Sequence, residues 1–345
     1  MKAKAALLGL LDGLSSAREG ADRDALSQYM APQAIAEFYD PFGSGVGLEE
    51  IETAFWAPLK SAFPDYEIRP GLVLEGRYED RMHASVLGHV IGTFLDPLAY
   101  IPPTRKMASL RIGINAVFES EKIVAFFVMV DLIDLMRQAG VYPFRAMPGS
   151  DGPWFMPPAE TGTGRGEGSG IRTLDIVREM QHGLPDGPAV VDRASAAAHH
   201  SPHWAERMNW FGPAGIGSSR GMEGFRDSHG ALFLKAFPDR HGLPRAAGTD
   251  VGRQGHFCEI GEGRLAMTGG WPNMRAHHRG GHWLGLPPTG CRIDMRVSDW
   301  YRLDDANRIV DNWVMMDIPH MLAQMGLDVF EDLPFAANPQ RSRLP

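Results

Sequence analysis

Met295-Arg-Val-Ser-Asp-Trp-Tyr-Arg-Leu303 is rich in the β-branched and aromatic residues that favour a β-strand. Turn-forming residues follow at 304–307, and a second alternating segment runs from Ile309 to Met316. Asp317 then offers a capping side chain to a short apolar helix, and Gly326 supplies its stop. This stretch therefore predicts a β-hairpin that runs into a short helix.

The same pattern occurs earlier in the chain. Val130-Asp-Leu-Ile-Asp-Leu-Met-Arg-Gln138 matches Met316-Asp-Ile-Pro-His-Met-Leu-Ala-Gln324 at a constant offset. Upstream, Pro102-Pro-Thr104 matches Pro287-Pro-Thr289, and Ala62-Phe-Pro-Asp65 matches Ala236-Phe-Pro-Asp239. In this alignment Gly113 to Ala116 stands where Asp299 to Arg302 stands. A repeat of this length predicts a duplicated domain, because each copy is far longer than a solenoid unit.

Each copy reads as helices followed by strands. In the first copy, apolar residues recur every four positions over 49–63, which predicts a helix, and 25–30 and 32–38 read as further short helices. Strands are predicted at 66–74, 81–92, 108–118 and 122–130. This segregation indicates an α+β domain in which helices cover one face of an antiparallel sheet.

The domain boundaries follow from the repeat and from a Pro- and Gly-rich stretch between the copies. We predict a first domain at 1–145, a linker at 146–170, a second domain at 171–333 and a tail at 334–345. The alternating glycines of the linker lack the preceding strand and the following lysine of a phosphate loop.

Composition narrows the classes of partner. The formal charge of −8 on 345 residues, without a basic stripe, argues against nucleic acid. No apolar run is long enough for a membrane span, so no membrane partner is expected. The two cysteines, Cys258 and Cys291, have no paired spacing, and a reducing cytoplasm is the expected location.

Several motifs in the second copy, and weaker echoes in the first, resemble the SnoaL-like polyketide cyclase group of the NTF2-like superfamily. They are Gly221-Met-Glu-Gly-Phe225, Ala236-Phe-Pro-Asp239, Gly285-Leu-Pro-Pro-Thr-Gly290, Asp299-Trp-Tyr-Arg302, Ile309-Val310, Trp313 and Asp317 with Gln324-Met-Gly326. The resemblance implies two tandem cone-shaped domains, each a curved antiparallel sheet around helices with a pocket for a small apolar molecule. It also implies that the copies pack as an intramolecular pseudo-dimer, with further homo-oligomers possible.

The resemblance also implies chemistry without a cofactor. In the family's cyclases the acid/base aspartate lies three residues before the Asp that opens the closing helix. Those positions are Val314 and Val128 here, and a valine cannot accept a proton. The carboxylate of the usual mechanism is therefore missing at both positions, whereas the pocket is still expected.

Three residues are candidates for catalysis. Asp299, buried among tryptophans, would have a raised pKa suited to a base, although an ion pair with Arg296 or Arg302 is an equal alternative. His278, interpreted as the counterpart of His89, shares a predicted strand face with His282 and could meet Asp299 across the pocket. Asp317 is the third candidate, with a helix cap as its structural alternative.

Aromatic and polar side chains are concentrated in the second copy, where the pocket is therefore expected. The candidate substrate-binding residues are Trp210, His229, Trp271, His282, Trp283, Trp300, Arg302, Trp313 and Val314. Any one of these tryptophans could instead belong to the core. His229 stands where the first copy has Phe55.

No metal is predicted. His199, His200 and His203 have a ligand-like spacing if helical, but Pro202 interrupts the segment and no carboxylate completes the set. The favoured function is a cofactor-independent lyase, isomerase or hydrolase that acts on a small apolar carbonyl or ester by general acid/base catalysis. The alternative is a non-catalytic protein that binds a small hydrophobic metabolite.

Overall fold

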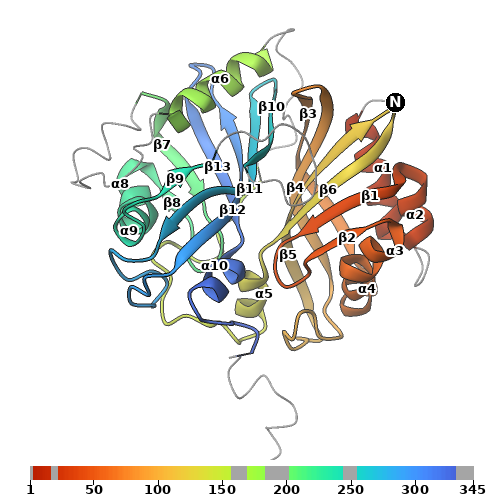
Figure 1. The fold of residues 1–345 in the computed structure, drawn as a ribbon, viewed down its shortest axis with the longest axis horizontal. Helices are drawn as coiled ribbons and strands as arrows, with labels where there is room; N and C mark the ends of the chain where they lie inside the picture. The colour runs from red at the N-terminus through yellow and green to blue at the C-terminus, as the bar shows by residue number, and fades with distance from the viewer. Residues whose placement is uncertain (1–2, 17–21, 157–168, 183–201, 244–254, 332–345) are drawn as a thin grey trace, which may run out of the picture. The chain divides into compact units, whose positions relative to one another are not determined.

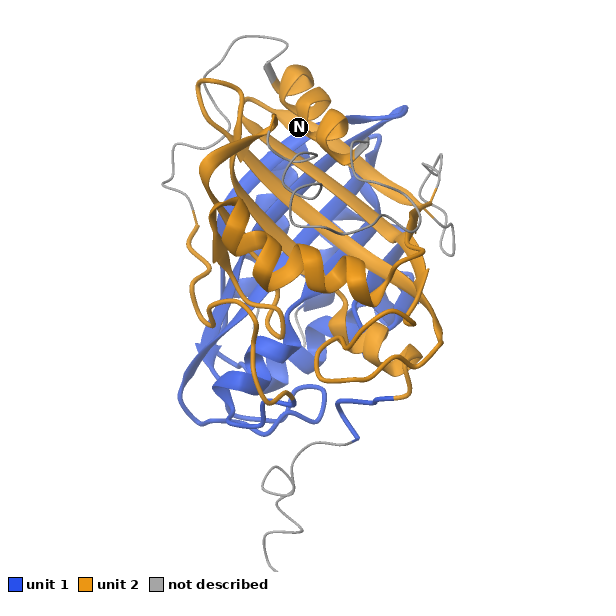
Figure 2. Cartoon of the chain, turned by 90° about the vertical axis from the view of Figure 1, so that its left-hand side faces the viewer, with its two compact units in different colours: residues 1–143, 327–345 blue, residues 144–326 orange. Residues whose placement is uncertain are grey.

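The computed structural model describes residues 3–16, 22–156, 169–182, 202–243 and 255–331. The chain divides into two compact units, which Figure 2 colours separately. Unit 1 comprises residues 1–143 with 327–345, and unit 2 comprises residues 144–326. Each unit contains one sheet with helices packed against it, so the predicted tandem α+β fold is confirmed. The predicted pseudo-dimer stays a prediction.

Unit 1 begins with helices and a strand pair, continues with a second helical segment and four long strands, and ends with a short helix. Its elements are α1 (Ala3–Ser16), α2 (Asp22–Tyr29), β1 (Met30–Phe38), β2 (Ser44–Val46), α3 (Leu48–Ile51), the π-helix η1 (Glu52–Trp56), α4 (Ala57–Ala62), β3 (Glu67–Tyr78), β4 (Arg81–Thr93), β5 (Met107–Glu119), β6 (Lys122–Val130) and α5 (Leu132–Gln138). The six-stranded sheet has the order β2-β1-β6-β5-β4-β3 (Figure 1).

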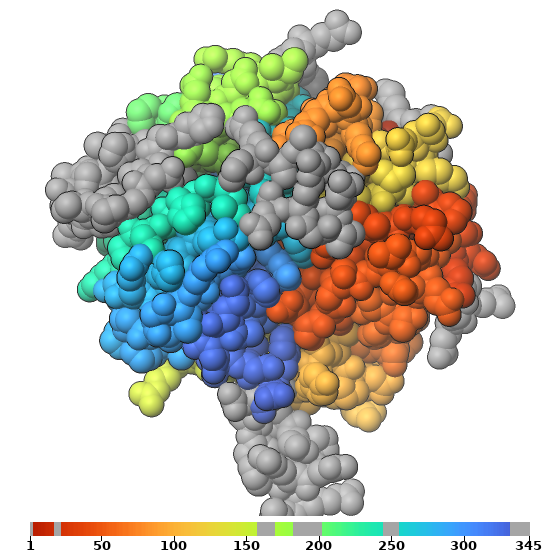
Figure 3. Space-filling model, viewed as in Figure 1, coloured from red at the N-terminus to blue at the C-terminus, as the bar shows by residue number. Residues whose placement is uncertain are grey.

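Unit 2 repeats this plan. Its elements are α6 (Ser169–His182), β7 (Trp204–Phe211), β8 (Ser219–Arg220), α8 (Gly221–Phe225), the π-helix η2 (Arg226–Gly230), α9 (Ala231–Ala236), β9 (His241–Gly242), β10 (His256–Glu262), β11 (Leu265–His277), β12 (Arg292–Leu303), β13 (Ile309–Met316) and α10 (Ile318–Gln324). The seven-stranded sheet runs β10-β11-β12-β13-β7-β8, with β9 paired to β11. Helix α10 lies against β12 on the face shown in Figure 3.

The predicted helix at 32–38 is wrong, because these residues belong to strand β1. Ala34, Ala36 and Phe38 are buried at alternate positions, which is the period of a strand and not that of a helix. Strand β1 also pairs in parallel with β6, as β7 does with β13. Both sheets are therefore mixed, with one parallel pair added to the predicted antiparallel meander.

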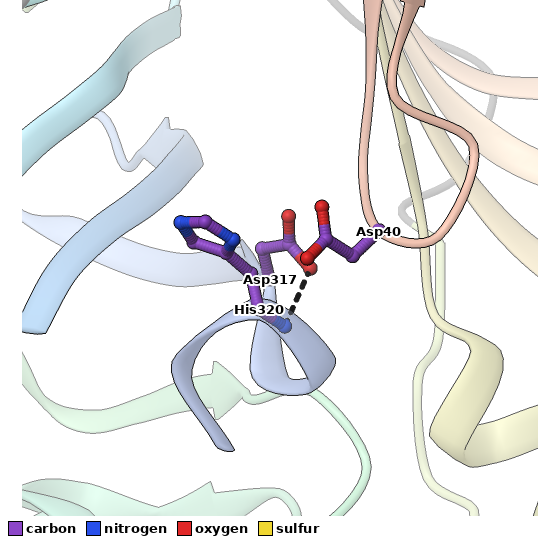
Figure 4. Close-up of side chains that lie close together, drawn as sticks. All are labelled: Asp40, Asp317 and His320. Carbon is purple, nitrogen blue, oxygen red and sulfur yellow. Dashed lines mark hydrogen bonds between the residues drawn. The ribbon is translucent and has the colours of Figure 1, made fainter. Parts of the chain in front are cut away.

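The repeated Asp and Gln motif closes each unit in the same way. Asp317 accepts a hydrogen bond from His320 N at 3.3 Å and so caps α10 (Figure 4), and Arg296 pairs with its other oxygen at 3.1 Å. In unit 1, Asp131 caps α5 and pairs with Arg111 at 2.9 Å. The motif is therefore structural, because it fastens the closing helix to the neighbouring strand.

These paired contacts also correct the alignment of the two copies. Gln138 binds the backbone of Ser109, and Gln324 binds the backbone of Asp294 in the same manner. Ser109 and Arg111 therefore correspond to Asp294 and Arg296, which differs by one residue from the alignment read from the sequence. A shift of one residue exchanges the two faces of a strand.

Segment 146–156, which the sequence analysis placed in the linker, is ordered in unit 2. Ser150 pairs with Ser218, and the Trp154 indole donates to Phe211 O at 3.1 Å. Among the described residues, no helix is both long and apolar enough to cross a membrane.

Candidate functional site

Unit 2 contains a cavity of about 760 Å³ between its helices and its sheet. Met180 and Gln181 of α6 form one part of the wall, and β7 to β13 form the floor. The lining residues are Met180, Gln181, Trp204, Trp210, Phe225, His229, Gly230, Phe233, Leu234, Arg240, Gly242, Leu243, His256, Glu259, Asn273, Met274, Val297, Asp299, Tyr301, Asn312, Val314 and Met316. The cavity is thus mainly aromatic and apolar, with a few polar groups at defined positions.

Strand alternation places the polar groups of the floor. Asp299 lies directly opposite Val314 on β13 and opposite Thr268 on β11, so the three side chains share one row across the sheet. In the next row, Tyr301 lies opposite Asn312. The carboxyl group is therefore one strand away from Val314, the position where the resembled family carries its aspartate.

Asp299 is the titratable centre of the site. Its side chain is part-exposed, and this surface faces the cavity that it lines. Burial raises the pKa of Asp299 to about 7, against the opposing hydrogen bonds from Asn312 and Tyr301. A carboxyl group with this pKa exchanges protons readily near neutral pH.

Tyr301 connects Asp299 to helix α6. Gln181 Nε2 lies 2.9 Å from Thr268 Oγ1 and 3.3 Å from the Tyr301 hydroxyl, and the same hydroxyl hydrogen-bonds Asp299. Burial, with Asp299 nearby, raises the pKa of Tyr301 well above its usual value. Tyr301 therefore keeps its proton and can donate it in a hydrogen bond.

Asn312 holds the carboxyl group from the neighbouring strand. Its Nδ2 donates to Asp299 Oδ1 and to Trp300 O, both at 3.2 Å. The Trp300 backbone fixes the orientation of the amide, and the amide in turn fixes one oxygen of Asp299. Asp299 is thus preorganised by contacts from strands β12 and β13.

The helix side of the cavity is an aromatic wall. The His229 ring stacks on Trp210 with centroids 4.5 Å apart and an interplanar angle of 12°. Phe225 and Phe233 lie on either side of His229 along the helix, at 5.6 and 5.1 Å. The wall offers flat apolar surface to a ligand, with a single imidazole among the rings.

Charged and amide side chains also line the cavity. Arg240 is 5% exposed, and Glu259 is 1% exposed and pairs with Arg178 at 2.8 Å. Asn273 is a further lining residue, and its Oδ1 has no hydrogen-bond partner within the described residues. These residues contrast in polarity with the aromatic wall.

The sequence-predicted residues divide between the two faces of the sheet. Of these residues, Asp299, Trp210, His229 and Val314 line the cavity. Trp300 and Trp313 are fully buried and, by alternation, point to the opposite face, where Trp313 stacks on Phe211 and donates to Phe155 O at 3.0 Å. Arg302 pairs with Asp311 at 2.7 Å and does not line the cavity.

The structure does not bring His278 into the cavity. Its ring lies 2.9 Å from Gly281 O and 3.3 Å from Thr289 Oγ1, and it contacts Phe237. Its neighbour His277 binds Asp239 as Thr93 binds Asp65, so the true counterpart of His278 is Phe94, which stacks on Phe63. His278 therefore takes the place of a core phenylalanine, and His89 is not its counterpart.

The other candidates also lie outside the cavity. Trp283 packs on Phe237, His282 is exposed, and Trp271 lies beneath Arg296 at 5.1 Å. Asp317 is fully buried, with its oxygens used by the helix cap and by Arg296. Of the histidine cluster, His199 and His200 lie outside the described residues.

Residues that line the cavity but were not predicted from the sequence include Tyr301, Asn312, Gln181, Glu259 and Arg240. Alternation from Asp299 and Val314 would have identified the first two, since they occupy positions two residues away on the same face. The other three come from distant segments, and the sequence carries no local signal for them.

No protein-family model matches the chain, and no curated protein matches it. Solved structures do. A proposed SnoaL-like polyketide cyclase from Jannaschia is 21% identical over 40% of this chain and 92% of its own, with a TM-score of 0.33. A proposed polyketide cyclase from Streptomyces antibioticus and a proposed hydroxylase from Streptomyces galilaeus are each 17% identical over 41% of this chain, and over 100% and 82% of their own, with TM-scores of 0.33. The family that the motifs resemble is thus among the similar structures, and each match spans about the length of one copy.

Proposed function

We propose that the unit 2 cavity is the active site of a cofactor-independent enzyme in which Asp299 is the general acid/base. The substrate class is a small apolar carbonyl or ester compound, and the reaction is a lyase, isomerase or hydrolase step. The observation that carries this proposal is a carboxyl group with a pKa of about 7 on the wall of a largely apolar cavity.

The neighbours of Asp299 support a proton-transfer role. A base in an apolar site removes a proton from a carbon next to a carbonyl, and negative charge then develops on the carbonyl oxygen. The Tyr301 hydroxyl, held by Gln181, is a donor placed beside the same carboxyl group. Asp299 can then return the proton to the substrate, because its pKa leaves both protonation states populated at neutral pH.

Solvent deuterium exchange tests this proposal without a known natural substrate. A panel of small apolar ketones and esters is incubated with the protein in D₂O, and loss of the α-proton signal is followed by NMR. We expect exchange for at least one compound, and Asp299→Asn should slow it by about a hundredfold or more, because the amide keeps the shape and cannot accept the proton.

Asp311→Asn is the matched control, since Asp311 is a buried carboxylate of the adjacent strand that pairs with Arg302 outside the cavity. It should leave exchange unchanged in the folded protein. Exchange that survives in Asp299→Asn at the wild-type rate would contradict the proposal. Compounds that bind tightly to the wild type, with neither exchange nor turnover, would favour a metabolite-binding protein.

A further inference from the structure

The two units place very different side chains at equivalent positions of the helix above the cavity. In unit 1, η1 (Glu52–Trp56) ends with Trp56, and in unit 2, η2 (Arg226–Gly230) ends with Gly230. Both segments are π-helical, have the same length and continue directly into a six-residue α-helix. Trp56 and Gly230 are therefore counterparts.

The residues that surround Trp56 in unit 1 are also replaced in unit 2, by more polar residues. Trp56 is fully buried and lies 6.3 Å from Phe126 and 5.0 Å from Phe55, which it meets edge-on. Phe126 pairs with Ala36 and Ala116, as Asn312 pairs with Trp210 and Tyr301. The counterparts of Phe55 and Phe126 are thus His229 and Asn312, and both line the cavity.

Trp210 does not refill the space that Gly230 leaves open. A Cβ atom added at Gly212, the counterpart of Phe38, would lie 2.2 Å from the Trp210 ring. Phe38 stacks on Phe55 just as Trp210 stacks on His229. The Trp210 indole therefore replaces the Phe38 ring and not the Trp56 indole, and Gly230 lines the cavity beside Phe225.

We propose that Gly230 is the residue that determines specificity in the cavity, and that the space above it binds a planar bicyclic aromatic ring of about the size of an indole. This inference rests on the cavity being the active site proposed above. A ring in that space meets His229 edge-on, as Trp56 meets Phe55. Its polar edge faces Asn312, whose amide contacts Asp299, so that a hydroxyl or carbonyl substituent is presented to the acid/base group.

Binding of 2-naphthol, a planar bicyclic phenol, tests this inference by titration calorimetry, with phenol as the single-ring comparison. The wild type should bind 2-naphthol at least tenfold more tightly than phenol. Gly230→Trp should remove this preference, because the indole fills the space itself. Since the added Cβ lies 3.3 Å from Phe225, Gly230→Leu is a second, smaller variant, and it should weaken 2-naphthol binding by about tenfold.

Gly224→Leu is the matched control, since Gly224 lies in α8 of the same helical segment but does not line the cavity. It should bind 2-naphthol as the wild type does. Equal affinity for 2-naphthol in the wild type and in a folded Gly230→Trp or Gly230→Leu variant would overturn the inference, as would a wild type without preference for two rings. Asp299→Asn should retain 2-naphthol binding, so failure of the acid/base proposal is distinguishable from failure of this one.

Discussion

Asp299 and Ile114 occupy the same place in the two sheets. Asp299 lies opposite Val314, and Ile114 lies opposite Val128, the counterpart of Val314. One copy of the duplicated fold thus carries a titratable group where the other carries a fully buried isoleucine. The same exchange of apolar for polar or small residues occurs at Phe126 and Trp56, whose counterparts Asn312 and Gly230 line the unit 2 cavity.

Replacing each of these two residues by its counterpart should have opposite effects on the free energy of unfolding. Asp299→Ile removes a desolvated carboxyl group and should raise the free energy of unfolding at pH 8. Ile114→Asp buries a carboxylate in a packed apolar core and should lower it by about 3 kcal/mol or more. Urea unfolding of both variants at pH 8 measures the effect. Similar losses in the two variants would show that Asp299 is paired and not desolvated.

The pH dependence of stability should report the pKa of Asp299. This pKa is about 7 in the folded protein, against 3.8 for an ordinary aspartate. The group therefore contributes stability fully below about pH 4, and this contribution is lost as pH rises through 7. Relative to the wild type, Asp299→Asn should gain up to about 4 kcal/mol between pH 4 and 8, at roughly 1.4 kcal/mol per pKa unit.

Asp239→Asn should change the pH dependence of stability in the opposite direction, and it serves as the reference. Although burial opposes it, hydrogen bonds from His277 and Arg279 lower the pKa of Asp239 to about 2. Its contribution is present above pH 4 and is lost as pH falls toward 2. Asp239→Asn should therefore be destabilising at neutral pH. A flat difference between Asp299→Asn and the wild type from pH 4 to 8 would contradict the raised pKa.

His278→Phe should preserve both folding and any activity of the cavity. The replacement restores the residue type of Phe94, which packs on Phe63 as His278 packs on Phe237. Thermal unfolding and the α-proton exchange assay are the two measurements. A variant that keeps its melting temperature but loses exchange would restore His278 to the catalytic role that the sequence suggested for it.

Arg296→Met should be strongly destabilising. Asp317 is fully buried and pairs with Arg296 at 3.1 Å, so loss of the arginine leaves a buried charge without this partner, at a cost of about 3–5 kcal/mol. Asp317→Asn in the same chain should recover part of that loss. No recovery in the double variant would mean that Arg296 acts mainly through its packing on Trp271.

Local sequence patterns were sufficient to predict the duplication and most of the helices and strands. The hairpin at 295–316, its closing helix and the helix after residue 48 all follow from periodicity and from turn or capping residues. Segment 32–38 failed because two of its three alternating buried residues are alanines, Ala34 and Ala36 beside Phe38, which give a weak period-2 signal in the sequence. Its strand lies between β2, with which it pairs antiparallel, and the distant strand β6, with which it pairs in parallel.

By itself, the sequence determined the α+β fold and its repetition and made Asp299 a candidate base, because these depend on residue type and local period. Only the tertiary structure decided which face of each strand lines the cavity, and it placed Trp300 and Trp313 on the opposite face. The reason is register. A one-residue difference between the two copies is invisible in a gapless alignment, yet it moves every side chain of a strand to the other face of the sheet.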